Sequence, residues 1–263
     1  MNNIFIEGIQ GMGKSTLSNN LITKIPELHI CREGDYSPIE LAWCTWMTKE
    51  EYDQTLKHYE TLREEIIKNT FQEGNHYIIT YTKILTDIPN FHKELEKFEI
   101  YNGRTSLDNL KEIVYSRYQN FSGTGYLFEC SFLQNIVEDL ILFHQLCDDE
   151  IMDFYQKLYS MIDKDSFLLL YLYSDKLEEN IMAIKKERCD ELGNELWYSM
   201  MLEYLIQSPY GKQHGFTGFE DMIRHFKHRQ QVELRIINEI IRDRAVILPA
   251  KNWNIDDITA LIS

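Results

Sequence analysis

Near its start the chain carries a glycine-rich segment that constrains the fold more than any other feature. Residues 8–15 read GIQGMGKS, which fits the pattern G-x-x-x-x-G-K-[ST]. A short apolar segment at residues 3–7 precedes it, and residues 14–25 have the character of a helix. In that setting the glycines leave backbone N–H groups free to surround a phosphate at the positive end of the helix dipole. The pattern therefore predicts a phosphate-binding P-loop; the alternative is a plain glycine turn before a helix.

The side chains that follow the glycines have the chemistry that a bound nucleotide needs. Lys14 is expected to reach the β- and γ-phosphates, and the Ser15 hydroxyl is expected to bind Mg²⁺. The predicted nucleotide-binding set of this segment is Gly8, Gly11, Gly13, Lys14, Ser15 and Thr16. ATP and Mg²⁺ are therefore the predicted cofactors.

The charge balance limits the partners. The 263 residues carry 27 Lys and Arg against 42 Asp and Glu, a formal net charge of -15. Such a field repels nucleic acid and anionic lipid over most of the surface, so neither is expected as a partner. A polyanionic small ligand would then need a local basic pocket, which makes each cluster of Lys and Arg informative.

Several features favour a protein of the cytoplasm. The opening residues, MNNIFIEG, lack the basic start and the long apolar run of a signal peptide. The longest apolar runs, such as residues 167–173, have the length of strands and are too short to span a bilayer. The 5 cysteines are odd in number and form no C-x-x-C pair, so reduced thiols are expected rather than disulfides or a zinc site.

Strand-like and helix-like segments alternate along most of the chain. Strands are expected at residues 3–7, 28–31, 76–84, 126–129, 167–173 and 245–248. Helices are expected at residues 14–25, 49–69, 131–146, 150–162, 175–187, 195–207 and 230–242, within 92–120 and after 254. This alternation predicts an α/β fold of the P-loop NTPase type, with three layers and a five-stranded parallel sheet centred on the strand at 3–7. We expect a single domain over residues 1–263, with helical insertions at about 45–120 and 205–240.

Further motifs separate the classes of nucleotide-binding proteins. A GTPase would show an N-K-x-D motif after a strand, and the sequence has none. A motor or transport ATPase usually has an apolar strand that ends in Asp-Glu, for which the candidates here are Glu129 and Asp175. Asp175-x-x-Glu178 is interpreted as a helix cap. Glu129 ends a strand expected beside the P-loop strand, where a carboxylate can hold Mg²⁺ directly or through water.

Short motifs in a consistent order give the chain a family resemblance. The opening IEGIQGMGKST resembles the start of deoxynucleoside kinases and thymidylate kinases. CREG at residues 31–34 is similar to the T-R-E-P turn of thymidylate kinases and the E-P turn of deoxynucleoside kinases. FECS at 128–131 resembles the E-R-S motif of deoxynucleoside kinases, and KERCDE at 186–191 resembles their lid. Together these similarities cover roughly residues 1–40, 126–146 and 165–210.

The resemblance implies an ATP- and Mg²⁺-dependent kinase that acts on a small molecule. Glu33 would orient or deprotonate the acceptor hydroxyl. Lys186 and Arg188 would close over the transferring phosphoryl group, Lys186 on the nucleotide and Arg188 as a catalytic cation. The alternative for these cations is a solvated helix end that complements the helix dipole. In a chain with so negative a charge, the lid interpretation is favoured.

Three further side chains are candidates for binding the acceptor. Asp35 lies in D-Y-S-P, for which the turn and acceptor interpretations are equally good. Trp43, with Trp46 and Tyr52, could stack on a planar ring, although residues at such helical spacing are more often part of a core. Gln134, one turn into an expected helix, could read a polar acceptor, and an amide on the helix surface or in the core is an equal alternative.

Cys130 departs from the pattern of both kinase families. In those families an Arg follows the acidic residue at the end of this strand and contacts substrate or phosphate. Ser131 does not replace it, because Ser131-x-x-Gln134 itself fits a capping box. Arg32 and Arg104 are alternative sources of the charge. The departure weighs against a nucleoside monophosphate as the acceptor.

We therefore expect a kinase of the nucleoside and nucleotide type, whose acceptor is a nucleoside, a nucleotide or an unrelated alcohol such as an antibiotic. The alternative is a nucleotide-dependent switch or regulatory ATPase, in which the segments at 45–120 and 205–240 form the surface for a protein partner. A homodimer is compatible with the apolar helix at 131–146 packing across a two-fold axis, and burial of that helix in the core explains it equally well.

Overall fold

The computed structural model describes residues 1–189 and 195–262, which fall into two compact units. The first unit joins Met1–Ile30 to Ser122–Ser263, and the second is Cys31–Phe121. The insertion expected at about 45–120 lies within the second unit, whereas the segment at 205–240 lies within the first.

A five-stranded parallel sheet organises the first unit, as the alternation of strands and helices predicted. Its strands, in spatial order, are β2 (His29–Cys31), β6 (Tyr126–Glu129), β1 (Asn3–Glu7), β7 (Phe167–Tyr173) and β8 (Ala245–Pro249). The expected central position of β1 is confirmed, because Ile6 is paired with Glu129 on one side and with Leu170 on the other. Since the strands run the same way, the carboxyl ends of β1, β6 and β7 meet at one edge of the sheet.

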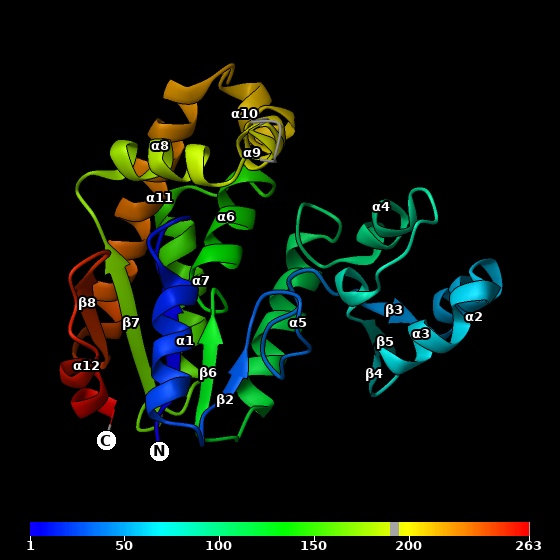
Figure 1. The fold of residues 1–263 in the computed structure, drawn as a ribbon, viewed down its shortest axis with the longest axis horizontal. Coiled ribbons are helices and arrows are strands. Elements are labelled where there is room, and N and C mark those ends of the chain that lie inside the picture. The colour runs from blue at the N-terminus through cyan, green and yellow to red at the C-terminus, as the bar shows by residue number, and fades with distance from the viewer. Residues whose placement is uncertain (190–194, 263) are drawn as a thin grey trace. The chain divides into compact units, whose positions relative to one another are not determined.

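Apolar side chains explain why β1 and β7 occupy the middle of the sheet. All of β1 is buried, and so is β7 up to its last residue. The Phe5 ring stacks on Phe128 and Phe167, with ring centroids 5.0 and 4.6 Å apart. Figure 1 shows α1 (Lys14–Lys24) in front of the strands and α7 (Asp148–Ser160) behind them. Strands covered on both faces are expected to be apolar throughout, and the arrangement is compatible with the predicted three layers.

The remaining helices of the first unit follow the predicted order with shifted ends. They are α6 (Gln134–Leu142), α8 (Leu177–Glu187), α9 (Leu196–Gln207), α10 (Pro209–Gln213), α11 (Phe219–Ile236) and α12 (Ile255–Ile262), with a π-helical turn η4 (Ile237–Ile241) and a 3-10 turn η5 (Arg242–Arg244). The helix predicted at 230–242 is thus the second half of α11 and its π-helical extension. In the described part of the chain, no helix is both long and apolar enough to cross a membrane.

One predicted helix cap is wrong. The N-cap of α8 is Lys176, one residue after Asp175, and the Asp175-x-x-Glu178 box is out of register with the helix start. A capping box works only when its first residue is the N-cap and its fourth is the third helical residue. At α11 that spacing does occur, and the Asp221 carboxylate accepts a hydrogen bond of 3.1 Å from the Gly218 amide.

The second unit contains a small antiparallel sheet, of which only the strand at 76–84 was expected from the sequence. Its strands are ordered β3 (Met47–Thr48), β5 (His76–Ile79) and β4 (Thr70–Glu73). Gly74 and Asn75 join β4 to β5, and Gly74 has a φ of 54°, as a two-residue hairpin turn requires. A Gly-Asn pair between two β-rich runs was the sequence signal for this hairpin.

Short helices surround this sheet. They are α2 (Lys49–His58), α3 (Arg63–Lys68), α4 (Phe91–Leu95) and α5 (Leu107–Asn120), with 3-10 turns η1 (Glu60–Leu62), η2 (Tyr81–Lys83) and η3 (Glu96–Phe98). A capping box starts α2: Thr48 Oγ1 accepts from the Glu51 amide at 3.3 Å, and the Glu51 carboxylate accepts from the Thr48 amide at 2.8 Å. The single helix expected over 49–69 is interrupted at Tyr59, whose ψ of 52° leaves the helical region.

Buried carboxyl groups link the stability of the second unit to pH. Glu99 is 4% exposed, and its carboxylate accepts hydrogen bonds from the Tyr81 hydroxyl at 2.5 Å and the Asn102 amide at 3.1 Å. Burial raises the pKa of Glu99 from 4.5 to about 7, although the Tyr81 hydrogen bond opposes the change. Burial likewise raises the pKa of Glu40 to about 7. Between about pH 4.5 and 7 the unfolded chain therefore loses protons that the folded chain keeps.

We expect Glu99→Gln to weaken the pH dependence of stability. Glu99 favours the folded state below about pH 4.5, and this contribution of at most about 3 kcal/mol is lost as the pH rises through about 7. Urea unfolding at pH 5 and pH 8 should show a smaller fall in the free energy of unfolding for the variant than for the wild type. Glu64→Gln, at an exposed position of α3, is the matched control. An unchanged pH dependence in Glu99→Gln would contradict the assignment.

Candidate functional site

The glycine loop, residues 8–13, leaves β1 at the carboxyl edge of the sheet and turns directly into α1. Gly8, Gly11 and Gly13 have φ values of 138°, 76° and 90°. A Cβ on Gly8 would lie 2.5 Å from the Leu172 carbonyl oxygen, and one on Gly11 would lie 1.5 Å from Ile184 Cδ1. The predicted need for glycine at these positions therefore comes from backbone conformation and from close approach of β7 and α8.

Lys14, the first residue of α1, folds its side chain back over this loop. Its Nζ donates hydrogen bonds to the carbonyl oxygens of Gly8 at 2.8 Å and Ile9 at 3.0 Å. The residue is only 7% exposed. The ammonium group is thus held against the glycine loop, where a cation favours an anionic ligand.

Ser15 and Glu129, the two residues expected to bind a metal, meet at the start of α1. The Ser15 hydroxyl donates to the Glu129 carboxylate, and Ser18 Oγ lies 3.4 Å from the other oxygen of that carboxylate. Glu129 is the last residue of β6 and is 6% exposed. The following residue, Cys130, has a φ of 62°, a left-handed conformation that is uncommon for a non-glycine residue. Its backbone amide donates to the Ile6 carbonyl at 3.1 Å, so the β1–β6 pairing extends through this sharp turn.

Glu7, the residue before the glycine loop, was not predicted to matter and has a clear structural role. Its carboxylate accepts hydrogen bonds from the backbone amides of Phe132 at 2.6 Å and Gln134 at 3.0 Å. It is fully buried, and burial raises its pKa to about 7 although these amides oppose the change. Glu7 therefore accepts hydrogen bonds from N–H groups at the start of α6. In most helices a side chain close in sequence accepts these bonds.

This arrangement corrects the expectation for Ser131 and Gln134. α6 begins at Gln134, so Ser131-x-x-Gln134 is not its capping box, and the Ser131 hydroxyl instead donates to the Glu129 carbonyl at 3.2 Å. Gln134 is 6% exposed and belongs to the first turn of a buried helix. Of the alternatives left open by the sequence, a buried amide describes Gln134 best, and a role in binding the acceptor stays a prediction.

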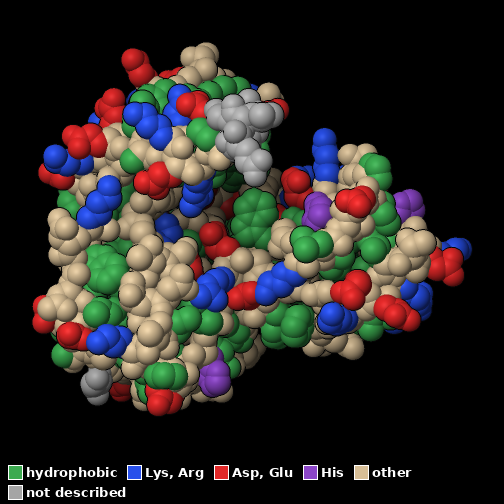
Figure 2. Space-filling view, in the orientation of Figure 1, with side chains coloured by type: hydrophobic (Ala, Val, Ile, Leu, Met, Phe, Trp, Pro, Cys, Tyr) green, Lys and Arg blue, Asp and Glu red, His purple; other side chains and the backbone are tan. Residues whose placement is uncertain are grey.

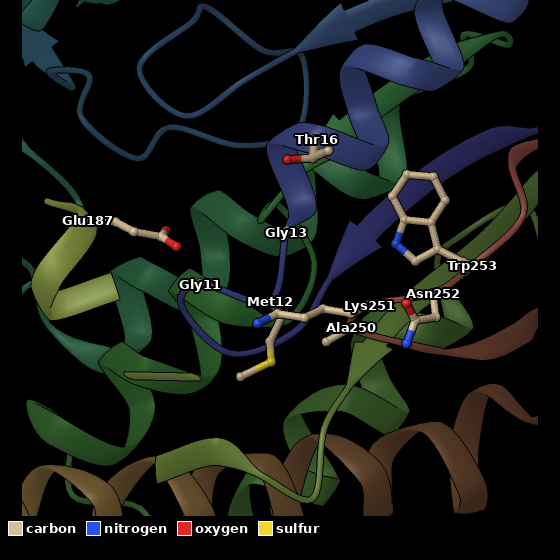
Figure 3. A pocket seen from close by; sticks show the side chains of 9 residues that line it. All are labelled: Gly11, Met12, Gly13, Thr16, Glu187, Ala250, Lys251, Asn252 and Trp253. Carbon is tan, nitrogen blue, oxygen red and sulfur yellow. The ribbon is translucent and has the colours of Figure 1, made fainter. Parts of the chain in front are cut away.

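A pocket of about 370 Å³ opens beside the glycine loop. Its lining residues are Gly11, Met12, Gly13, Thr16, Glu187, Ala250, Lys251, Asn252 and Trp253. Figure 3 shows the Trp253 indole and the Glu187 carboxylate on opposite sides of the loop. No motif in the sequence marks residues 250–253, which follow β8. They reach the loop because the Ala250 amide donates to the Tyr173 carbonyl at 2.8 Å and continues the β7–β8 pairing.

The predicted lid cations lie at the end of α8. Lys186 and Arg188 are both exposed, two and four residues beyond the Ile184 side chain that approaches Gly11. The acidic residues of the same motif, Asp190 and Glu191, lie outside the described residues. The geometry is compatible with both interpretations of these cations, the lid and the solvated helix end.

Two basic side chains at the end of α8 lie over aromatic rings of α9. The Arg188 guanidinium is 5.4 Å from the centre of the Trp197 ring, and Lys185 Nζ is 4.0 Å from the centre of the Tyr198 ring. Such cation–π contacts contribute roughly 0.5–1 kcal/mol at exposed sites, which is weak enough for a bound phosphate to compete with them.

Glu33, Asp35 and Trp43 lie together in a loop of the second unit. The Gly34 amide donates to the Ala42 carbonyl at 3.2 Å, which brings the neighbours Glu33 and Trp43 close along the backbone. Glu33 is exposed, and Trp43 is 47% exposed with a φ of 61°. The core interpretation of Trp43 is therefore wrong, and the acceptor-binding alternative stays a prediction.

The other residues of that aromatic group are correctly described as packing residues. Tyr52 is buried and stacks on Tyr77 at 4.5 Å between ring centroids, and Trp46 stacks on His76 at 4.1 Å. Helical spacing failed at Trp43 because residues 41–46 form no helix: 42–44 make a turn and a bend in the segment before β3.

Asp35 behaves as a turn residue. Its carboxylate accepts from the Arg32 backbone amide at 2.8 Å, and its own amide donates to the Arg32 carbonyl at 3.0 Å. Lys83 forms an ion pair with the same carboxylate. The turn alternative is thus supported by the geometry. Arg104, one of the residues considered as a source of the charge missing at position 130, forms an ion pair with Glu96.

The surface charge does not by itself mark a polyanion site. Figure 2 shows Lys and Arg side chains interspersed with Asp and Glu on the face in view, and no extended basic area covers the described part of that face. Any phosphate-binding capacity must therefore come from local groups such as Lys14 and the backbone amides of the glycine loop.

Known proteins offer no further constraint on the site. No protein-family model matches the chain, and no curated protein matches its sequence.

The close approach of β7 to the glycine loop predicts that Gly8→Ala is destabilising. The new Cβ would meet a backbone carbonyl that cannot rotate away, and the φ of 138° is strained for alanine. We expect a loss of roughly 1–3 kcal/mol in the free energy of unfolding from the strained conformation, with the clash adding to it. Urea unfolding measures this loss.

Gly215→Ala is the matched control in the same unit. Gly215 also has a positive φ, of 64°, but a Cβ there would meet nothing within 4 Å. Gly8→Ala should therefore be clearly less stable than Gly215→Ala, and equal stabilities would argue against a tight junction between the loop and β7.

Proposed function

We propose that the chain is an ATP- and Mg²⁺-dependent phosphotransferase that acts on a small molecule. The observation that carries this proposal is the junction of Ser15, Glu129 and Lys14 at the carboxyl edge of the parallel sheet. A hydroxyl, a carboxylate and an ammonium group there border a loop whose backbone amides can surround a phosphate. In open α/β sheets, ligands bind at this edge of the strands.

The residues at the junction fit a magnesium ion. Mg²⁺ takes hard oxygen ligands, usually one or two carboxylates with waters and substrate phosphates. The Ser15 hydroxyl and the Glu129 carboxylate are adjacent and offer such oxygens. When bound, Mg²⁺ would bridge phosphate oxygens and neutralise charge that develops during transfer. Ser18 Oγ, 3.4 Å from the carboxylate, would help to orient Glu129.

The pocket beside the glycine loop would take the base of the nucleotide. Its volume of about 370 Å³ is within the range of small-molecule sites. The Trp253 indole offers a stacking surface for a planar ring. The side-chain amide of Asn252 and the backbone near Ala250 offer hydrogen-bonding groups that could read the edge of a base.

Cations at the end of α8 would complete the charge stabilisation. Arg188 and Lys186 are exposed and form no ion pair with a carboxylate in the described part of the chain, whereas the neighbouring Lys185 pairs with Glu195. Interactions that form only as the phosphoryl group transfers are the ones that lower the barrier. In this proposal Arg188 would leave the Trp197 ring to contact the phosphoryl group, and Glu33 would orient or deprotonate the acceptor hydroxyl.

The first test is ADP formation from Mg·ATP with separate pools of nucleosides, nucleoside monophosphates and aminoglycoside- or macrolide-like alcohols. We expect one pool to raise turnover well above the basal rate, and splitting that pool would identify the acceptor. Lys14→Ala should reduce the stimulated rate by at least about a hundredfold, because the ammonium group stabilises charge on the transferring phosphoryl group. A slow hydrolysis rate that no pool changes would favour a nucleotide-dependent switch over a kinase of these acceptor classes.

Glu129→Gln tests the proposed metal site. The amide keeps the size of the side chain and a neutral oxygen but removes the charge that attracts Mg²⁺. The Mg²⁺ concentration for half-maximal activity should rise roughly tenfold or more, as is typical when the immediate surroundings of a metal are altered. Glu27→Gln, at an exposed position beyond α1, should leave the Mg²⁺ concentration for half-maximal activity unchanged. The same Mg²⁺ dependence in Glu129→Gln and the wild type would remove Glu129 from the site.

A further inference from the structure

A buried arginine contacts the glycine loop through the side chain of Gln10. Arg229 of α11 donates from Nη2 to Gln10 Oε1 at 2.7 Å. Arg229 is completely buried, 219 positions away from Gln10 in the sequence. An arginine with no exposure has a high desolvation penalty, so its partners must be well defined.

Acidic partners hold the Arg229 guanidinium in one orientation. Its Nη1 donates to Glu138 at 2.8 Å, and its Nε lies 3.1 Å from a Glu233 oxygen. The other Glu233 oxygen accepts from the Tyr171 hydroxyl at 2.6 Å, and Glu138 also lies 2.9 Å from His225. Nη1 is hydrogen-bonded to Glu138 of α6, Nε is ion-paired with Glu233 of α11, and Nη2 contacts the glycine loop.

The chemistry of arginine determines which end of the Gln10 amide faces it. A guanidinium has donors only, so the group that it contacts must be the amide oxygen rather than the amide nitrogen. The Gln10 amide nitrogen therefore points the other way. Within the described residues it donates to no partner, and it is not completely enclosed by protein atoms. Arg229 thus occupies the oxygen end of the amide and leaves the two N–H donors of Gln10 available.

These donors belong to the loop that would hold phosphate. The Lys14 ammonium bonds to the carbonyls of Gly8 and Ile9, immediately before Gln10. Burial raises the pKa of Glu233, whereas Arg229, the Tyr171 hydrogen bond and Lys14 lower it, so Lys14 and the Arg229 cluster are within electrostatic reach of each other.

We propose that Gln10 binds the phosphate chain through its amide nitrogen and that Arg229 is the positioning residue that fixes the orientation of this amide. The inference rests on the proposed nucleotide binding and adds a side-chain donor to the backbone amides and Lys14. Hydrogen bonds to a charged phosphate are stronger than neutral ones, so the donor is expected to matter for affinity.

Two substitutions at Gln10 separate a donor to phosphate from an anchor for the loop. Gln10→Leu removes both ends of the amide. Gln10→Glu keeps an oxygen that accepts from Arg229 but replaces the donor with a second negatively charged oxygen. The measurement is the Kd of Mg·ATP and of Mg·ADP by titration calorimetry. Gln213→Glu, at an exposed position of α10, controls for the added charge.

We expect both Gln10 variants to bind Mg·ATP at least about tenfold more weakly than the wild type, with Gln10→Glu the weaker of the two. Gln213→Glu should bind like the wild type. Wild-type affinity in Gln10→Glu, with a loss only in Gln10→Leu, would overturn the proposal and leave Gln10 as an anchor alone. Wild-type affinity in both variants would also overturn it.

Arg229→Lys tests the positioning role when the variant folds as judged by its circular dichroism spectrum. The lysine keeps a positive charge but loses the fork that contacts two carboxylates and Gln10 together. In a chain that already carries Gln10→Leu, adding Arg229→Lys should weaken Mg·ATP binding little further, because both changes act through the same amide. Additive losses would overturn the positioning role. If the wild type binds neither nucleotide, the proposed function itself fails, and this outcome is distinct from a wild type that binds and variants that match it.

Discussion

The pairing of β1 with both β6 and β7 is the interaction on which the first unit depends. It places three segments that are distant in sequence at one edge of the sheet. The glycine loop follows β1, Glu129 ends β6, and the Leu172 carbonyl of β7 lies against Gly8. Because the register sets Ile6 opposite Glu129, α1 begins where its Ser15 hydroxyl can meet that carboxylate. Every proposed role at the junction follows from this register.

Ionisable side chains buried next to the glycine loop connect it to the helices of the core. Glu7 ties the end of β1 to the start of α6, and Arg229 ties Gln10 to α6 and α11 through Glu138 and Glu233. Burying charge is unfavourable unless each group is paired and hydrogen-bonded, and removing one partner of such a group is strongly destabilising. The network therefore holds the loop in one geometry, which is a requirement for any site that must recognise a phosphate chain.

The second unit makes different use of buried polar groups. Its loop after β2 is shaped by the Asp35 turn and by the backbone contact between Gly34 and Ala42, which leaves Glu33 and Trp43 exposed. A tryptophan with a positive φ is strained, and strain of this kind concentrates at functional sites. The acidic core of this unit, with Glu40 and Glu99 titrating near pH 7, is a separate property that ties its stability to pH.

Local patterns in the sequence determined the strand at 3–7, the glycine loop and the parallel sheet, because each depends on neighbouring residues or on simple periodicity. The roles proposed for Lys14 and Ser15 also come from such a local pattern. Glu129 was also accessible, since it ends a short apolar run. The tertiary structure alone decided the contribution of Glu7, the Arg229–Gln10 contact and the pocket wall at residues 250–253. Those features join residues far apart in the chain, and their partners are chosen by sheet register and helix packing, which no local pattern encodes. The exposure of Trp43 was decided in the same way, because a turn replaced the helix that its spacing suggested.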